Sequence, residues 1–121
     1  MANVLIVDDS STMRKIISRS LRQAGLPVDE IYEASDGIEG LNVLEGKTVN
    51  LILSDINMPN MDGLEFIKQV RAKGIQVPIV MITTEGGEDI WKEAVNNGAS
   101  DSIKKPFTPD QLSEKLGGYM S

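Results

Sequence analysis

The chain has 121 residues, about the size of one domain. Apolar residues make up 40% of it and charged residues 25%, which is typical of a globular protein rather than a disordered or fibrous one. It has no cysteine and no histidine, which excludes disulfides, zinc fingers, cysteine nucleophiles and Ser-His-Asp triads. Its 12 basic and 18 acidic residues give a net charge of −6, which disfavours binding to nucleic acid.

The N-terminal residues lack the features of a targeting segment. No basic flank precedes the short apolar run 4–7, and no apolar stretch approaches the ~20 residues that span a bilayer. We therefore expect a cytoplasmic protein that does not insert into a membrane.

Five short apolar runs predict β-strands. Three are rich in consecutive Val, Ile and Leu, which is typical of parallel strands buried on both faces, and a fourth, at 100–103, is a weaker candidate for the same kind of strand. The other run, at 28–34, alternates more and indicates an edge strand. In chain order the predicted strands are 4–7, 28–34, 49–53, 77–82 and 100–103.

Amphipathic stretches follow each of these strands, with apolar residues at helical spacing. Three helix starts carry capping signals: Asp36 with Glu39, Asp62 with Glu65, and the segment 108–111, which reads Thr-Pro-Asp-Gln. The predicted stripes begin at Met13, Ile38, Leu64, Ile90 and Leu112; the first includes Ile16 and the second Leu41 and Leu44.

A strand and a helix therefore alternate five times, with no linker or internal repeat. Right-handed crossovers make such a chain an α/β, doubly wound, three-layer sandwich, which we expect to form a single domain over 1–121. In these folds ligands bind outside the carboxyl ends of the strands.

Polar side chains follow four of the predicted strands. Taken singly, an Asp at a strand end is more often a helix cap than a ligand. A Thr there is usually a cap or a strand former, and a Lys is usually exposed to solvent. Their coincidence at one sheet edge is more than capping requires. The residues are Asp8 and Asp9, Ser54 and Asp55, Thr83 and Thr84, and Lys104, Lys105 and Pro106.

Three clustered carboxylates repel one another unless they are protonated or bind a cation. Without His or Cys, the oxygen ligands favour Mg²⁺, with Mn²⁺ as a second choice. A divalent ion beside a carboxylate and a lysine is an arrangement for phosphoryl transfer. We expect Asp55 to be the attacking carboxylate, because it stands alone on the central strand.

The chain resembles the response-regulator receiver family, and most closely its single-domain chemotaxis members. The resemblance runs from the first strand to the last helix and implies a flavodoxin-like strand order 2-1-3-4-5 with five helices. The segments that carry it are 4–9 (VLIVDD), 11–14 (STMR), 54–63 (SDINMPNMDG), 98–100 (GAS) and 105–107 (KPF).

The resemblance also implies a role for each matched residue. Asp55 corresponds to the phosphoacceptor, and Asp9, Asp55 and the backbone carbonyl of Asn57 correspond to the direct Mg²⁺ ligands. Asp8 corresponds to the acid that holds the ion through water. Thr83 corresponds to the hydroxyl that moves to the phosphoryl group.

Further matched positions concern the phosphoryl group and its surroundings. Lys105 corresponds to the lysine that pairs with the phosphoryl group, and the peptide bond to Pro106 is expected to be cis. Asn57 and Glu85 correspond to the residues that flank the phosphoryl group and tune its hydrolysis.

The sequence departs from the family at two positions. Ser102 stands where the family usually has the aromatic residue that couples the threonine to the output surface, and Ile56 replaces a tryptophan beside the acceptor. The only tryptophan, Trp91, either packs partly against the core with Val95 or serves as an anchor on a partner-binding surface. We hypothesise that signalling runs instead through Gly86 and Gly87 to Trp91.

The function predicted is a stand-alone two-component response regulator, not an enzyme, with no output domain. The expected partners are a sensor histidine kinase, a downstream protein such as a flagellar motor switch component, and a phosphatase.

A phosphorelay intermediate is the alternative. A metal-dependent phosphatase is less favoured because the second acid of its Asp-x-Asp motif is Asn57 here. An FMN-binding electron carrier is disfavoured by the acid pair in its phosphate loop, and an unphosphorylated scaffold by the complete residue set.

Overall fold

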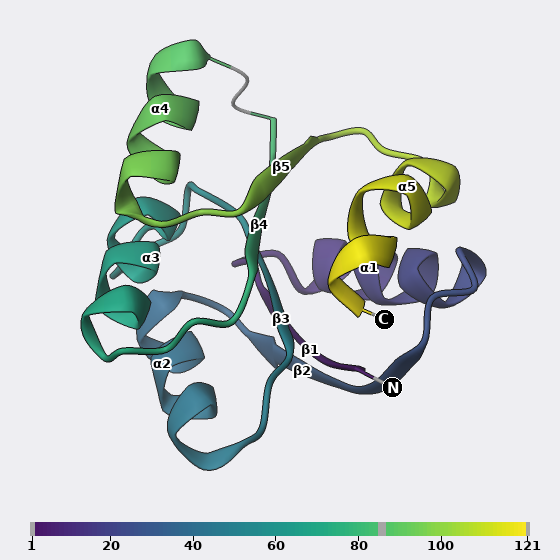
Figure 1. Ribbon diagram of the computed structural model, residues 1–121, viewed down its shortest axis with the longest axis horizontal. Helices are drawn as coiled ribbons and strands as arrows, with labels where there is room; N and C mark the ends of the chain where they lie inside the picture. The colour runs from purple at the N-terminus through teal and green to yellow at the C-terminus, as the bar shows by residue number, and fades with distance from the viewer. Residues whose placement is uncertain (1, 85–86, 121) are drawn as a thin grey trace.

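The computed structural model describes residues 2–84 and 87–120. Five parallel strands form one sheet in the order β2-β1-β3-β4-β5, and five helices cover it, which confirms the predicted fold. Helices α1 and α5 lie on one face, and α2, α3 and α4 lie on the other (Figure 1). The elements are β1 Ala2–Val7, α1 Ser11–Gln23, β2 Val28–Ala34, α2 Gly37–Gly46, β3 Leu51–Ser54, α3 Gly63–Ala72, β4 Ile79–Thr83, α4 Glu88–Asn97, β5 Asp101–Lys104 and α5 Pro109–Met120.

Strand β2 has the predicted bounds, and the other four strands differ from the prediction by one or two residues at one or both ends. Strand β4 begins at Ile79 rather than at residue 77, because Pro78 has no N–H and the Val77 carbonyl accepts a hydrogen bond from Arg71. At its other end the strand includes Thr83, whose register partner in β5 is Lys104. Thr83 therefore ends a buried strand instead of beginning a loop.

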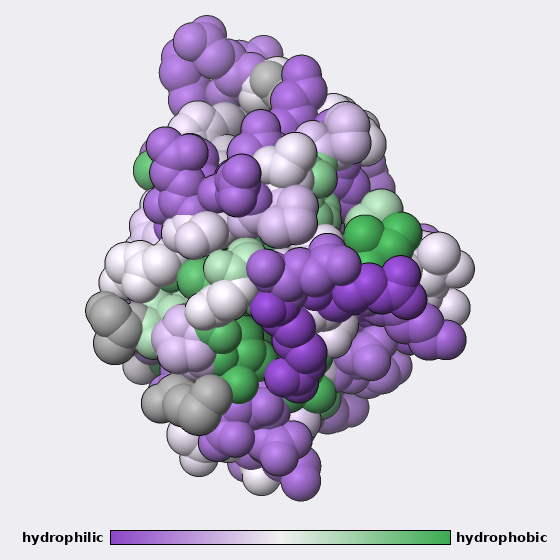
Figure 2. All heavy atoms as spheres, turned by 90° about the vertical axis from the view of Figure 1, so that its right-hand side faces the viewer, coloured by the Kyte–Doolittle hydropathy of each residue, from purple (hydrophilic) through white to green (hydrophobic). Residues whose placement is uncertain are grey.

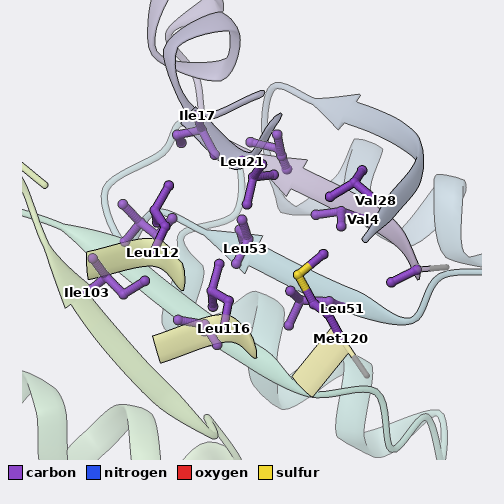
Figure 3. Close-up of a cluster of buried hydrophobic side chains, with 14 residues drawn as sticks. Val4, Ile17, Leu21, Val28, Leu51, Leu53, Ile103, Leu112, Leu116 and Met120 are labelled. Atoms are coloured by element: carbon purple, nitrogen blue, oxygen red, sulfur yellow. The ribbon is translucent and has the colours of Figure 1, made fainter. Parts of the chain in front are cut away.

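Two apolar cores lie on the two faces of the sheet. Figure 3 shows the first, where Ile17 and Leu21 of α1 and Leu112 and Leu116 of α5 face the side chains of β1 and β3. The second core lies under α2, α3 and α4 and centres on Phe66, which is fully buried. Alternate residues of each strand supply the two cores, as expected for strands covered on both faces.

Four helices begin with side-chain caps. Ser10, Asp36 and Asp62 accept hydrogen bonds from backbone N–H groups three residues on, as capping residues do. Thr108 and Gln111 form a reciprocal capping box, with both hydrogen bonds present. The three starts predicted from sequence are therefore confirmed, and Ser10 is a fourth.

Two predicted core positions are wrong. Ile38 is 47% exposed and Ile16 is 42% exposed. Helix α2 packs through glycines instead: a Cβ at Gly37 would lie 2.7 Å from Met61, and one at Gly40 would lie 2.9 Å from Phe66. Because α2 packs through the face that carries Gly37 and Gly40, Ile38 lies on a different face of the helix and is exposed to solvent.

Arg71 links α3 to the C-terminal end of α4. Its guanidinium donates to the carbonyls of Gly98 (3.1 and 2.9 Å), Ile75 (2.9 Å) and Val77 (2.8 Å). Burial lowers the pKa of Arg71, although an arginine remains charged at neutral pH. Asn97 adds a hydrogen bond from α4 to the Leu64 carbonyl at 3.1 Å.

The outer face of α1 is basic, in contrast to the acidic chain as a whole. The helix has no acidic residue, and Figure 2, which views the α1 and α5 side, shows a hydrophilic band with smaller apolar areas beside it. Of the four basic residues of the helix, Lys15, Arg19 and Arg22 are exposed and Arg14 is half-buried.

Candidate functional site

The residues predicted for the site meet at the carboxyl edge of the sheet. Asp8 and Asp9 follow β1, Asp55 follows β3, Thr83 ends β4, and Lys105 follows β5. Because parallel strands present their carboxyl ends at one edge, elements distant in sequence place these side chains together.

The three carboxylates form a compact cluster. Asp8, Asp9 and Asp55 each offer an oxygen, and these oxygens all lie within 4.8 Å of one another. Asp8 is buried (2% exposed), Asp55 is half-buried and Asp9 is exposed. Carboxylates this close repel strongly, because the interaction between unit charges at about 4 Å is ~4 kcal/mol at an effective dielectric near 20.

Lys105 partly offsets this repulsion. Its ammonium group lies 3.1 Å from Asp8 Oδ2 and 3.3 Å from Asp55 Oδ2, and the side chain is only 11% exposed. The Lys105–Pro106 peptide bond is cis, as the resemblance implied. The neighbouring Lys104 is exposed, so only one of the two lysines belongs to the cluster.

The loop after β3 is closed tightly around Asp55. The N–H of Ile56 donates to Asp55 Oδ1 at 2.7 Å, and the N–H of Gly63 donates to the Ile56 carbonyl at 2.7 Å. A Cβ at Gly63 would collide with the backbone carbonyl of Asp55, so this position requires glycine. Asn57 lies exposed in the same loop.

A second contact ties this loop to the start of α2. Asn60, at φ +66°, donates from its side-chain amide to Asp36 Oδ2 at 2.7 Å. The N–H of Glu39 and then this amide lower the pKa of Asp36 below its ordinary value. The sequence identified Asp36 only as a helix cap, so its role in bracing the loop was missed.

The loop after β1 is also braced from outside. The Arg14 guanidinium donates to the Asp8 carbonyl at 2.6 Å and to Glu33 Oε1 on β2 at 2.8 Å. Arg14 belonged to a matched sequence segment, but nothing in the sequence pattern paired it with Glu33. The two residues are 19 positions apart on different elements.

On the opposite side of the site, Thr83 is buried and Thr84 is exposed. Beside Thr83, a cavity of about 240 Å³ opens between the sheet and α4, and it is mainly apolar. Ser102 lines this cavity at the position where the family aromatic was expected. Half-buried Trp91 lines it too, whereas its proposed packing partner Val95 is 46% exposed. Glu85 and Gly86 lie outside the described residues.

The residues present suit a hard divalent cation. One ammonium group faces three carboxylates, which leaves two negative charges to be neutralised. All the donors are oxygens, which Mg²⁺ and Mn²⁺ prefer. The cluster can therefore hold a metal ion.

Comparison with protein families gives a direct answer. The model of the response regulator receiver domain matches residues 4–117. The chain belongs to the response-regulator receiver family. Receiver domains are signalling modules.

Receiver domains of the chemotaxis type are similar to this chain over nearly their whole length. A chemotaxis protein CheY homolog of Campylobacter jejuni is 46% identical over 116 residues, covering 93% of this chain and 88% of the relative. Chemotaxis protein CheY1 of Helicobacter pylori is 43% identical over 116 residues, which cover 93% of this chain and 92% of the relative. The solved structure of the chemotaxis response regulator CheY4 of Vibrio cholerae matches with a TM-score of 0.87 and 39% identity, over 98% of each chain.

Among the helices within 2–84 and 87–120, none is long and apolar enough to cross a membrane.

Proposed function

We propose that this receiver domain is a phosphorylation switch of the chemotaxis type, in which Asp55 accepts a phosphoryl group from a sensor histidine kinase. The observation that carries the proposal is Lys105, whose ammonium group contacts both Asp8 and Asp55 within a three-carboxylate cluster. A capping or structural role would not require three acids and a half-buried lysine at one sheet edge.

In the proposed reaction, one carboxylate oxygen of Asp55 attacks the phosphorus of the donor. An O–P bond forms to give an aspartyl phosphate, and the P–N bond of the kinase phosphohistidine breaks, with the electron pair returning to the imidazole nitrogen. Lys105 neutralises charge on the phosphoryl oxygens. The Ile56 N–H orients the acceptor carboxylate through its hydrogen bond to Oδ1.

Magnesium bound at this site would stabilise the charge on the phosphoryl oxygens during transfer. We assign its direct ligands as Asp9, Asp55 and the backbone carbonyl of Asn57, with Asp8 acting through water. Both Asp8 oxygens already accept hydrogen bonds, from the Ser10 N–H and from Lys105, which supports an indirect role. No hydrogen bond or ion pair forms to the Asp9 carboxylate within the described part of the chain, which supports a direct one.

The remaining predicted residues have supporting roles. Thr83 would move to bind the phosphoryl group, and Asn57 and Glu85 would tune its hydrolysis. We expect the altered surface to involve Ser102, Trp91 and Pro106, with Trp91 reporting the change because it lines the cavity beside Thr83.

The similarity to chemotaxis proteins supports the choice of partners. We propose a cytoplasmic histidine kinase complex as the donor, a component of the flagellar motor switch as the target, and a phosphatase that restores the resting state. A phosphorelay intermediate would share the acceptor chemistry but pass its phosphoryl group to a second histidine.

The test is phosphorylation of the purified chain by acetyl phosphate with Mg²⁺, followed by intact-mass spectrometry. We expect one phosphoryl group, lost in Asp55→Asn and in excess chelator, and retained in Asp62→Asn, a matched change at an exposed helix cap. In the wild type, beryllofluoride with Mg²⁺ should also change Trp91 fluorescence, and Asp55→Asn should abolish that change.

An adduct that persists in Asp55→Asn, or that forms equally well with chelator, would contradict the proposal. Repeated turnover of a phosphate ester, with no retained adduct, would favour the metal-dependent phosphatase instead.

A further inference from the structure

Every hydrogen-bonding group of Asp8 has a partner. Its N–H donates to the Ala34 carbonyl at 3.0 Å, and its own carbonyl accepts from Arg14 Nη1 at 2.6 Å. Its Oδ1 accepts from the Ser10 N–H at 2.9 Å and its Oδ2 from Lys105 Nζ at 3.1 Å. Asp8 is therefore held by its backbone as well as by its carboxylate.

Arg14 is itself fixed at a second point. Its Nε donates to Glu33 Oε1 at 2.8 Å, and its side chain is only 16% exposed. Glu33 directly precedes Ala34 on β2, so the end of this strand holds Asp8 twice, once directly and once through Arg14. The two contacts use different nitrogens of one planar guanidinium, a geometry that a lysine cannot reproduce.

The backbone contact bears on Asp9 as well. The Asp8 carbonyl and the Asp9 N–H belong to the same planar peptide unit. Fixing that carbonyl therefore fixes the plane from which the Asp9 carboxylate projects. Asp9 is exposed and has no other restraint from a side chain among the described residues.

We propose that Arg14, braced by Glu33, is a positioning residue that sets the affinity of the carboxylate cluster for its divalent cation. The inference rests on the proposed function, since the cation is the Mg²⁺ that phosphoryl transfer requires. Arg14 contacts the Asp8 carbonyl and Glu33 and no carboxylate of the cluster, so it would act through the Asp8–Asp9 peptide.

Two simpler roles for Arg14 predict different results. If Arg14 acted only through its charge, removing that charge beside a cation site would strengthen Mg²⁺ binding. If it only satisfied a buried carbonyl, removing it would destabilise the fold and leave the Mg²⁺ affinity of the folded protein unchanged. A positioning role predicts that loss of Arg14 weakens Mg²⁺ binding. The direction of the change in Mg²⁺ affinity therefore distinguishes the three roles.

The experiment is calorimetric titration of the full chain with Mg²⁺ alone, without a phosphodonor, beside thermal unfolding of each variant. We expect Arg14→Met to weaken Mg²⁺ binding about 10-fold, as loss of a supporting partner of a metal ligand does. Arg14→Lys and Glu33→Met each remove one of the two contacts and should weaken Mg²⁺ binding about 3-fold. Arg19→Met removes the same charge from an exposed site on α1 and should change it less than about 2-fold.

Phosphorylation by acetyl phosphate provides a second readout. In Arg14→Met the Mg²⁺ concentration for half-maximal rate should rise with the dissociation constant, while the rate at saturating Mg²⁺ stays within about 2-fold of wild type. A general structural defect would not raise the Mg²⁺ concentration for half-maximal rate while leaving the rate at saturating Mg²⁺ unchanged.

Unchanged or tighter Mg²⁺ binding in Arg14→Met overturns the inference. If that variant fails to fold, wild-type affinity in both Arg14→Lys and Glu33→Met overturns the inference instead. If the wild type binds Mg²⁺ with the predicted dependence on Arg14 but gains no adduct on Asp55, the proposed function fails and the positioning role stands.

Discussion

The two sides of the site are held in different ways. On the carboxylate side, hydrogen bonds from Arg14, Ser10 and Lys105 fix Asp8, and the Asp36–Asn60 contact fixes the loop after β3. On the hydroxyl side, the N-cap position of α4 is Gly87, which supplies no side-chain cap, and a cavity of about 240 Å³ lies beside it. The opposite end of α4 is anchored again, by two hydrogen bonds from Arg71 to the Gly98 carbonyl, and the same guanidinium donates two more to Ile75 and Val77 before β4.

This contrast suits a switch. A metal site needs ligands held in one geometry before the ion arrives, because ordering them on binding would cost affinity. A surface that responds to phosphorylation needs a segment with few restraining contacts, since such segments have low local stability. The anchored end of α4 would let its first turns move while its last turn stays in place.

The anchor at Arg71 can be broken by Arg71→Met. The change removes four hydrogen bonds and leaves three part-buried carbonyls without their donor, so we expect about 3 kcal/mol less stability in urea unfolding. Lys73→Met removes an exposed ion pair to Glu45 in the same region and should cost less than about 0.5 kcal/mol. Equal effects of the two changes would show that α4 is not anchored at this end.

The brace between Asp36 and Asn60 predicts a pH dependence. The pKa of Asp36 is lowered, so its stabilising contribution is present above its ordinary value of about 4 and is lost as the pH falls through the lower folded value. Asn60→Gly keeps the positive φ and removes the amide, and should cost about 1 kcal/mol at pH 7. This cost should shrink below about pH 4, measured by urea unfolding at several pH values.

The control for this prediction is the same change made in Asp36→Asn. There, the cost of Asn60→Gly should no longer depend on pH, since no carboxylate remains to be protonated. A pH dependence that survives in the double variant would assign it to another group.

The start of α4 has no side-chain cap, so adding one by a single substitution tests whether this end is less restrained than the carboxylate side. Gly87 has extended backbone angles, and a Cβ there would meet no atom within 4 Å. Gly87→Ser should add an N-cap and stabilise the chain by about 0.5 kcal/mol, whereas Gly87→Ala, which adds no oxygen, should fall about 1 kcal/mol below it. If the serine variant is no more stable than the alanine variant, the missing cap is not what distinguishes this helix.

Much of the site could be predicted from the sequence. Asp8, Asp55, Thr83 and Lys105 each follow or end an apolar run, and in a parallel sheet the ends of such runs must meet at one edge. The capping residues Asp36, Asp62 and Thr108 were equally accessible, because a cap depends on residues only three positions apart. Local spacing and strand direction were sufficient for both.

The bracing contacts could not be predicted from local sequence spacing or strand direction. Arg14 and Glu33 lie 19 positions apart, Asp36 and Asn60 lie 24 apart, and Arg71 and Gly98 lie 27 apart. Each pair depends on the distance and angle at which two elements pack, which no periodicity encodes. The exposure of Ile16 and Ile38 has the same origin, since the face that a helix buries depends on how closely it approaches the sheet.

The sequence by itself therefore determined the order of the elements and which side chains reach the carboxyl edge, because hydrophobic period and chain direction are local properties. Only the tertiary structure decided which contacts hold the acidic loops in place and where α4 is anchored or left uncapped beside a cavity. Those features arise from packing between elements distant in the chain, where small differences in approach decide whether a donor reaches its acceptor.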